Sequence, residues 1–246
     1  VALGARFDDR VTGHLASFAP GAKVIHADID PAEIGKNRAV DVPIVGDVGH
    51  VLEDLLKIWK SRGRKTNPAV QQWWAQIEQW RAKNCLGYRP SDSVIKPQHA
   101  MERLEALTAG HDRYITTEVG QHQMWAAQHC RFSRPEAHIS SGGLGAMGFG
   151  LPAGIGAKLA RPEATVITIA GDGGFMMNIQ ELATLKRYGI PLKIVLIDNS
   201  SLGLVRQWQE LFFAGNYSEI DLSDNPDFAA LARVFGIPAH HISLRD

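Results

Sequence analysis

The alternation of short β-rich runs with helical segments is the feature that most restricts how this chain can fold. Strand-like runs at residues 114–117, 166–170 and 192–197 are each followed by a stretch with helical periodicity. Such alternation predicts βα units, in which a helix returns the chain so that the next strand lies parallel to the last. We therefore expect an α/β fold with a doubly wound parallel sheet.

The elements of this sheet are expected within residues 97–246. Helices are predicted at 98–107, 122–129, 148–160, 179–188, 202–213 and 226–235, and strands at 114–117, 138–140, 166–170, 192–197 and 239–243. Doubly wound sheets bind ligands at the carboxyl ends of their strands. The expected place for chemistry is therefore the set of loops that follow residues 117, 140, 170 and 197.

The first sixty residues have the pattern of a second, incomplete α/β domain. A strand at 23–28 ends on Asp28, and Asp30-Pro31 offers an N-cap and a first-turn proline for a short helix. Asp47 precedes a further helix at 48–59. We interpret residues 1–60 as the tail of a nucleotide-binding domain, 61–96 as an interdomain linker and 97–246 as the main ligand-binding domain.

Charge and cysteine content narrow the class of ligand and the compartment. The 26 Lys and Arg residues balance 26 Asp and Glu residues, so no net field attracts nucleic acid or an anionic membrane, and a small-molecule ligand is expected. Cys85 and Cys130 form no CxxC pair, which suits a reducing cytoplasm. The chain opens on Val1 without a Met and stops after a strand-like run, so we expect both ends to be cut from a longer protein.

Oxygen-bearing side chains follow two successive predicted strands. Residues 171–174 read Gly-Asp-Gly-Gly after the strand at 166–170, and 198–200 read Asp-Asn-Ser after the strand at 192–197. A diphosphate with Mg²⁺ needs hard oxygen ligands, which Asp172 and Asn199 can supply. Glycines let backbone amides approach phosphate oxygens closely. The alternative is two unrelated turns, one acidic and one of the Asn-Ser type.

A GDG sequence followed by Asn199 resembles the thiamine diphosphate (ThDP) and Mg²⁺ signature of decarboxylases and carboligases. Four further stretches, at residues 4–13, 118–125, 143–152 and 204–213, resemble the acetohydroxyacid (acetolactate) synthase family. The resemblance runs nearly from end to end and is weakest between residues 60 and 93. It implies a ThDP-binding fold for the second domain, and contacts with FAD in the first.

The resemblance implies the following site residues. Positions that match ThDP contacts are Gln121, His122, Gly145, Met147, Gly173 and Gly174. Positions that match metal ligands are Asp172, Asn199 and the backbone carbonyl of Ser201. Met147 would support the bent cofactor from below the ring junction. Without the resemblance, His122 would be interpreted as a surface histidine and Met147 as a core residue.

Substrate and flavin contacts are carried over in the same way. Arg10 matches the arginine that receives the carboxylate of the second 2-oxo acid, a task suited to a bidentate guanidinium. Trp208 matches the tryptophan that shapes the acceptor pocket, while Leu204 departs from the family's usual Met, a nearly volume-conserving change. Positions that match FAD contacts are Asp28, Ile29, Asp47 and Val48. Arg10 alone would be interpreted as a surface ion-pair partner.

The activity implied is decarboxylation of pyruvate and carboligation to a second pyruvate or to 2-oxobutanoate, in the biosynthesis of valine, leucine and isoleucine. The family works as homodimers or larger homo-oligomers with the site at the subunit interface, and binding of a small regulatory subunit stays open. The activating glutamate of the family belongs to a domain outside this chain, and Glu118 does not match it. We expect this chain alone to be inactive.

Three alternatives compete with this interpretation. Residues 143–148 satisfy GxGxxG, which is typical of dinucleotide-dependent dehydrogenases but weak evidence alone. Other ThDP enzymes, such as pyruvate oxidase, glyoxylate carboligase or an oxo-acid decarboxylase, would share GDG and Asn199. The third alternative is a noncatalytic fragment of such an enzyme.

Overall fold

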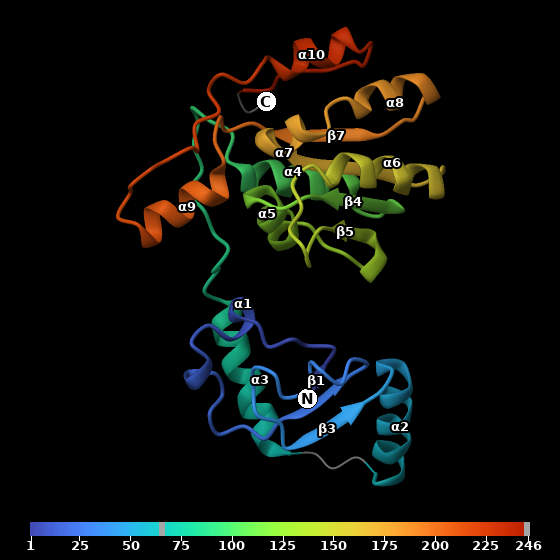
Figure 1. Cartoon of the computed structure of the whole chain (residues 1–246), viewed down its shortest axis with the longest axis vertical. Helices are drawn as coiled ribbons and strands as arrows, with labels where there is room; N and C mark the ends of the chain where they lie inside the picture. Colours follow the sequence, from blue (N-terminus) through green and yellow to red (C-terminus); the bar gives the residue numbers. More distant parts are fainter. Residues whose placement is uncertain (64–66, 244–246) are drawn as a thin grey trace. The chain divides into compact units, whose positions relative to one another are not determined.

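The protein was analysed as a computed structural model that describes residues 1–63 and 67–243. It divides into two compact units, Val1–Asn84 and Cys85–Asp246, and each is described by itself (Figure 1). No helix in these described ranges is long and apolar enough to cross a membrane. The domain limits expected from the sequence, with a linker at 61–96, stay a prediction.

The first unit is built on a small parallel sheet. Its strands β1 (Ala2–Leu3), β2 (Ile25–Asp28) and β3 (Val42–Val45) lie in the order β1-β2-β3. The accompanying helices are α1 (Asp9–Thr12), the 3-10 turn η1 (Leu15–Ser17), α2 (Val48–Ser61) and α3 (Pro68–Arg81). α2 begins where predicted, because Asp47 caps it by accepting hydrogen bonds from the N–H groups of Gly49 and His50.

Two expectations for this unit differ from the structure. The short helix predicted after Asp30-Pro31 is wrong: Asp30 Oδ1 accepts a hydrogen bond from the Ala32 N–H at 2.9 Å, but residues 31–38 form only turns and bends. Gly35, with φ of 75°, ends the turn before a helix can continue. β3 was not predicted because it contains Pro43, which lacks an N–H and is tolerated on an edge strand.

In the second unit, helices connect successive strands, and two further helices follow the last strand. Its elements are α4 (Pro97–Thr108), β4 (Arg113–Thr117), α5 (Gln121–His129), η2 (Pro135–Ala137), β5 (His138–Ser140), α6 (Gly150–Ala160), β6 (Thr165–Gly171), α7 (Asp172–Met177), α8 (Glu181–Tyr188), β7 (Lys193–Ile197), α9 (Gly203–Phe212) and α10 (Phe228–Val234). The strands are all parallel and lie in the order β5-β4-β6-β7. The predicted α/β fold with a parallel sheet is confirmed.

Successive side chains of β6 point to opposite faces of the sheet and contribute to the core on each face. Ile167 and Ile169 pack with Met101 of α4 and Ala126 of α5. Thr168 points to the other face, where Gly154 of α6 lies directly against its side chain. Both faces are therefore covered by helices, as a parallel sheet requires.

Two expectations for the second unit also need correction. Residues 239–243, predicted as a strand, are irregular, because no neighbouring strand pairs with them in the described part of the chain. Residues 171–174, predicted as a loop, are the last residue of β6 and the first turn of α7, which holds Asp172; the side chain of Phe175, also in α7, is buried in the core. An acidic residue is favoured in a first helical turn.

Candidate functional site

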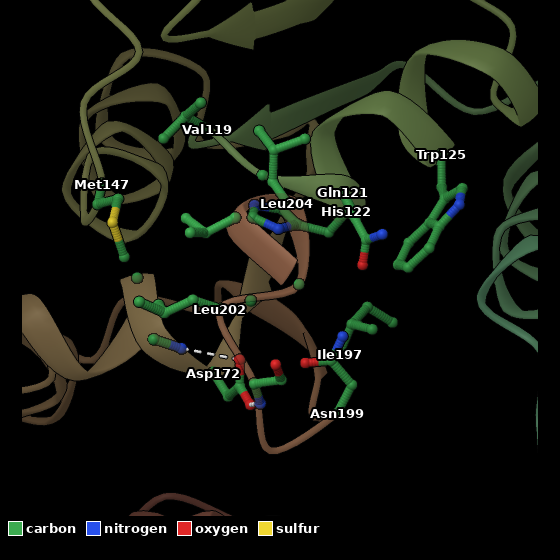
Figure 2. A pocket seen from close by; sticks show the side chains of 17 residues that line it. Val119, Gln121, His122, Trp125, Met147, Asp172, Ile197, Asn199, Leu202 and Leu204 are labelled. Atoms are coloured by element: carbon green, nitrogen blue, oxygen red, sulfur yellow. Dashed lines mark hydrogen bonds between the residues drawn. The ribbon is translucent and has the colours of Figure 1, made fainter. Parts of the chain in front are cut away.

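A pocket lies at the carboxyl ends of β4, β6 and β7 (Figure 2). Its walls come from residues 119–122 after β4, 171–174 around the end of β6, and residues between 199 and 205 after β7, with Met147 from the loop before α6. The register of the sheet places Ile169 opposite Thr117 and Ile197 opposite Gly171. Segments far apart in the sequence therefore meet at the predicted edge of the sheet.

Asp172 is the buried acid of this pocket. Only 3% of the residue is exposed, and its Oδ1 and Oδ2 accept hydrogen bonds from the N–H groups of Gly173 (2.9 Å) and Ser201 (3.2 Å). Burial raises the pKa of the carboxyl above its ordinary value, although the two N–H groups act in the opposite direction. A nearby cation would favour the charged carboxylate. The environment of Asp172 therefore fits a metal ligand.

The turn after β7 brings further oxygen atoms to the same pocket. Asn199 and Ser201 line it, and Ser200 between them adopts φ of 51°, which turns the chain sharply. Ser201 pairs with Asp221 in an antiparallel bridge, and its buried hydroxyl has no hydrogen-bond partner within residues 1–63 and 67–243. The structure thus brings Asp172, Asn199 and Ser201 together, while their role as metal ligands stays a prediction.

α5 begins beside the pocket with Gln121 and His122. The imidazole of His122 is buried, which lowers its pKa to about 4, so the ring is neutral near pH 7. Its Nε2 lies 3.8 Å from Glu118 Oε1, and because the ring is neutral this approach is not an ion pair. Gln121 Nε2 donates to Gln207 Oε1 of α9 at 2.9 Å. Burial excludes the alternative interpretation of His122 as a surface histidine.

Glycines form a close-fitting part of the wall. A Cβ on Gly173 would lie 2.7 Å from Leu202 Cδ2, and one on Gly203 would lie 2.8 Å from Asn199 Nδ2. Gly174 also lines the pocket. Because side chains at these positions would overlap their neighbours, the main chain itself faces any bound group, as phosphate binding requires.

Met147 reaches the pocket from the loop between β5 and α6. Figure 2 shows its side chain pointing toward Leu202, and its Cε lies 3.5 Å from the place that a Cβ would take on Gly173. Gly145 adopts φ of 66° and lies against Val119, outside the pocket lining. Met147 therefore lines the pocket, whereas Gly145 lies outside the lining, in a turn of the loop that carries Met147.

α9 supplies another wall. Leu204 and Val205 line the pocket, whereas Trp208 lies outside the lining and is 40% exposed. The indole of Trp208 contacts Phe212 edge to face, with ring centroids 5.4 Å apart. Leu204 is therefore found at the predicted site and Trp208 about one helical turn away from it.

The remaining predicted residues belong to the first unit. Arg10 is exposed on α1, and Asp28 is buried at the end of β2, where its Oδ1 accepts a main-chain N–H two residues further on. Ile29 is 71% exposed, and Asp47 and Val48 form the start of α2 after β3. Because β2 and β3 are paired, Asp28, Ile29, Asp47 and Val48 all lie at the carboxyl ends of these two strands.

Several residues at or beneath the pocket were not predicted as site residues from the sequence. Trp125 and Leu202 line it, and Glu118 lies buried under it with 1% of its surface exposed. The signal for Glu118 was its place directly after a buried strand. Trp125 follows His122 by three positions on α5 and so shares its helix face.

Comparison with known proteins agrees with this geometry. Residues 118–245 match the model of the thiamine pyrophosphate enzyme C-terminal TPP binding domain, and residues 1–55 match its central domain. The acetolactate synthase large subunit of Haemophilus influenzae is 48% identical over 95% of this chain, and the isozyme 2 large subunit of Escherichia coli is 51% identical over 100% of it. The chain belongs to the acetolactate synthase large-subunit family. The large subunit IlvB1 of Mycobacterium tuberculosis is likewise 52% identical over 96% of the chain.

Membership of the acetolactate synthase family confirms the resemblance found in the sequence. The chain spans about two fifths of the length of these relatives, between 39% and 43%. The dinucleotide-binding alternative for residues 143–148 is wrong, because these residues fall inside the TPP binding domain and follow β5, a strand of three residues.

Proposed function

We propose that the protein is an acetolactate synthase large subunit that binds ThDP and Mg²⁺ and joins the acetyl group of pyruvate to a second 2-oxo acid, with loss of CO₂. The observation that carries the proposal is the pocket at the carboxyl ends of β4, β6 and β7, where Asp172, Asn199 and Ser201 meet in a chain about 50% identical to acetolactate synthases. ThDP, when bound, supplies the electron sink for decarboxylation.

The donor set of the pocket supports Mg²⁺ as the metal. Carboxylate, amide and carbonyl oxygens are hard ligands, which Mg²⁺ prefers over nitrogen and sulfur. The Asp172 carboxylate, the Asn199 amide and the Ser201 carbonyl would hold the ion. The buried position of Asp172 supports this assignment because a divalent cation offsets the cost of burying its charge.

The remaining pocket residues fit the organic part of the cofactor. The main chain at Gly173 and Gly174, together with Gln121 and the neutral His122, would orient the diphosphate. The apolar side chain of Met147 would support the ring system and keep water from it. Gly145 would act indirectly, through the turn that presents Met147.

Substrate recognition is proposed for Arg10 of α1 and for Trp208 and Leu204 of α9. Arg10 would bind the carboxylate of the acceptor 2-oxo acid, and Trp208 with Leu204 would contact its alkyl chain, favouring 2-oxobutanoate over pyruvate. Support comes from Leu204, which lines the pocket one turn from Trp208 on α9. FAD would be held in the first unit by Asp28, Ile29, Asp47 and Val48, at one edge of its sheet.

The wider setting follows from the family. We propose a homodimer or larger homo-oligomer whose site is completed at a subunit interface, a cytoplasmic location, and a role in valine, leucine and isoleucine biosynthesis. A small regulatory subunit is a further candidate partner. The balanced charge of the chain supports small molecules, and not nucleic acid or a membrane, as its ligands.

Acetolactate formation from pyruvate by the full-length protein tests the proposal. The assay contains ThDP, Mg²⁺ and FAD, with 2-oxobutanoate as competing acceptor. Asp172→Ala should abolish product, while the control Asp112→Ala, at the amino end of β4, should retain activity. Release of acetaldehyde, or turnover only with oxygen uptake, would instead identify another ThDP enzyme. No ThDP-dependent turnover by the wild type would indicate a noncatalytic protein.

A further inference from the structure

Glu118 is a buried carboxylate that none of the proposed chemistry uses. It follows β4 directly, is 1% exposed, and lies outside the pocket lining. Removing a carboxylate from water costs several kcal/mol unless hydrogen bonds replace the lost solvation. Its partners therefore indicate what it does.

The partners of Glu118 are backbone groups of glycine-rich segments that are distant in the sequence. Oε2 accepts a hydrogen bond from the Gly148 N–H at 2.7 Å, and Oε1 accepts one from the Gly171 N–H at 3.2 Å. Burial raises the pKa of the Glu118 carboxyl, while the N–H groups of Gly148, Gly171 and Gly150 act in the opposite direction. Gly174 packs so closely that a Cβ there would overlap Oε1. One side chain thus contacts the loop before α6, the end of β6 and the first turn of α7.

Each hydrogen-bonded glycine adjoins a residue of the pocket. Gly148 follows Met147, and Gly171 precedes Asp172. Gly148 is also held through its carbonyl, which accepts a hydrogen bond from Asn178 Nδ2 at 2.8 Å. Bonds to a carboxylate are stronger than bonds between neutral groups, and through them Glu118 links the loop that carries Met147 to the strand end that carries Asp172.

We propose that Glu118 is a positioning residue, which ties the loop carrying Met147 to the strand end carrying Asp172 and thereby sets the width of the cofactor pocket. This inference rests on the proposed function in assigning that pocket to ThDP and Mg²⁺. It requires both carboxylate oxygens, because each accepts a bond from a different segment. A glutamine would turn an NH₂ donor toward one of the two N–H donors.

Glu118→Gln in the full-length protein tests the inference, with Glu105→Gln as the matched control. Glu105 is a partly buried carboxylate, with 21% of its side chain exposed, whose Oε2 accepts bonds from Arg113 Nη2 (2.8 Å) and the Arg131 N–H (3.0 Å), away from the pocket. Calorimetric titration with ThDP in the presence of Mg²⁺ should show the Kd raised at least about tenfold for Glu118→Gln. The Kd of Glu105→Gln should stay within about twofold of wild type.

Equal ThDP affinity in the two variants would overturn the inference. Hydrogen exchange supplies a readout that needs no cofactor: the Gly148 and Gly171 amides should exchange faster in Glu118→Gln and not in Glu105→Gln. If the wild type does not bind ThDP, the proposed function fails, and unchanged protection of these two amides would still refute the positioning role. Should Glu118→Gln not fold, Glu118→Asp, which keeps the charge but withdraws the oxygens, is expected to give the same two effects.

Discussion

Gly154→Ala should destabilise the protein although alanine is the better helix former. Gly154 lies inside α6, and a Cβ there would overlap Thr168 Oγ1 and approach Leu192 Cδ2 to 3.1 Å. Thr168 is fully buried and its hydroxyl is hydrogen-bonded to Thr116 Oγ1 at 2.8 Å. Moving it costs about 1–3 kcal/mol for overpacking and a similar amount for the strained hydrogen bond. After subtraction of about 1 kcal/mol of helix propensity, a net loss of about 3 kcal/mol is expected.

The same helix offers a matched control. Gly156 is exposed, and a Cβ there would meet no atom within 4 Å. Gly156→Ala should therefore stabilise the protein by about 0.5–1 kcal/mol. Urea denaturation followed by far-ultraviolet circular dichroism measures both free energies of unfolding. If Gly154→Ala were as stable as wild type, the close packing of α6 on β6 would be refuted.

Three further predictions concern charge, pH and capping. Asp172→Asn should weaken ThDP binding at least about tenfold and remove its dependence on Mg²⁺, because the proposed anionic metal ligand is lost; titration calorimetry with and without Mg²⁺ measures both effects. Burial lowers the pKa of His122 from 6.5 to about 4. As the pH falls, this imidazole is therefore protonated in the unfolded chain at a higher pH than in the folded protein. Stability is complete above pH 6.5, and about 3 kcal/mol should be lost by pH 4; denaturation of wild type and His122→Gln over this range should show a shallower pH dependence for the variant. Asp47→Ala should cost about 1 kcal/mol through loss of the α2 cap, visible as a lower urea midpoint, and Asp54→Ala, exposed on the same helix, should change it little.

Local patterns were sufficient for β4, β6 and β7 and for the place of the site. Buried parallel strands are rich in β-branched and aromatic residues, so β4, β6 and β7 were predicted within one residue at each end. Because ligands gather at the carboxyl ends of such strands, Asp172 and Asn199 could be assigned to one pocket from the sequence. Both follow neighbouring strands of the sheet.

Features that depend on distant contacts were not predictable from local patterns. The Gly148 N–H that donates to Glu118 lies thirty positions further along the chain. No local pattern around residue 118 indicates this hydrogen bond. Residues 239–243 have strand-like composition but no strand to pair with in the described chain. The positive φ of Ser200 depends on the tight turn after β7, not on the preference of serine.

The parallel register of β6 and β7 has a consequence for how this family can vary. Gly171 pairs with Ile197 in the last register pair of β6 and β7, so Asp172 and Asn199 lie one and two residues beyond this pair. An insertion within either strand would slip that ladder and turn one of the two side chains to the opposite face. Residues 161–163, which precede the amino end of β6, are exposed and carry no such constraint. Length changes among descendants, and peptide tags introduced by the experimenter, should therefore be tolerated at this connection.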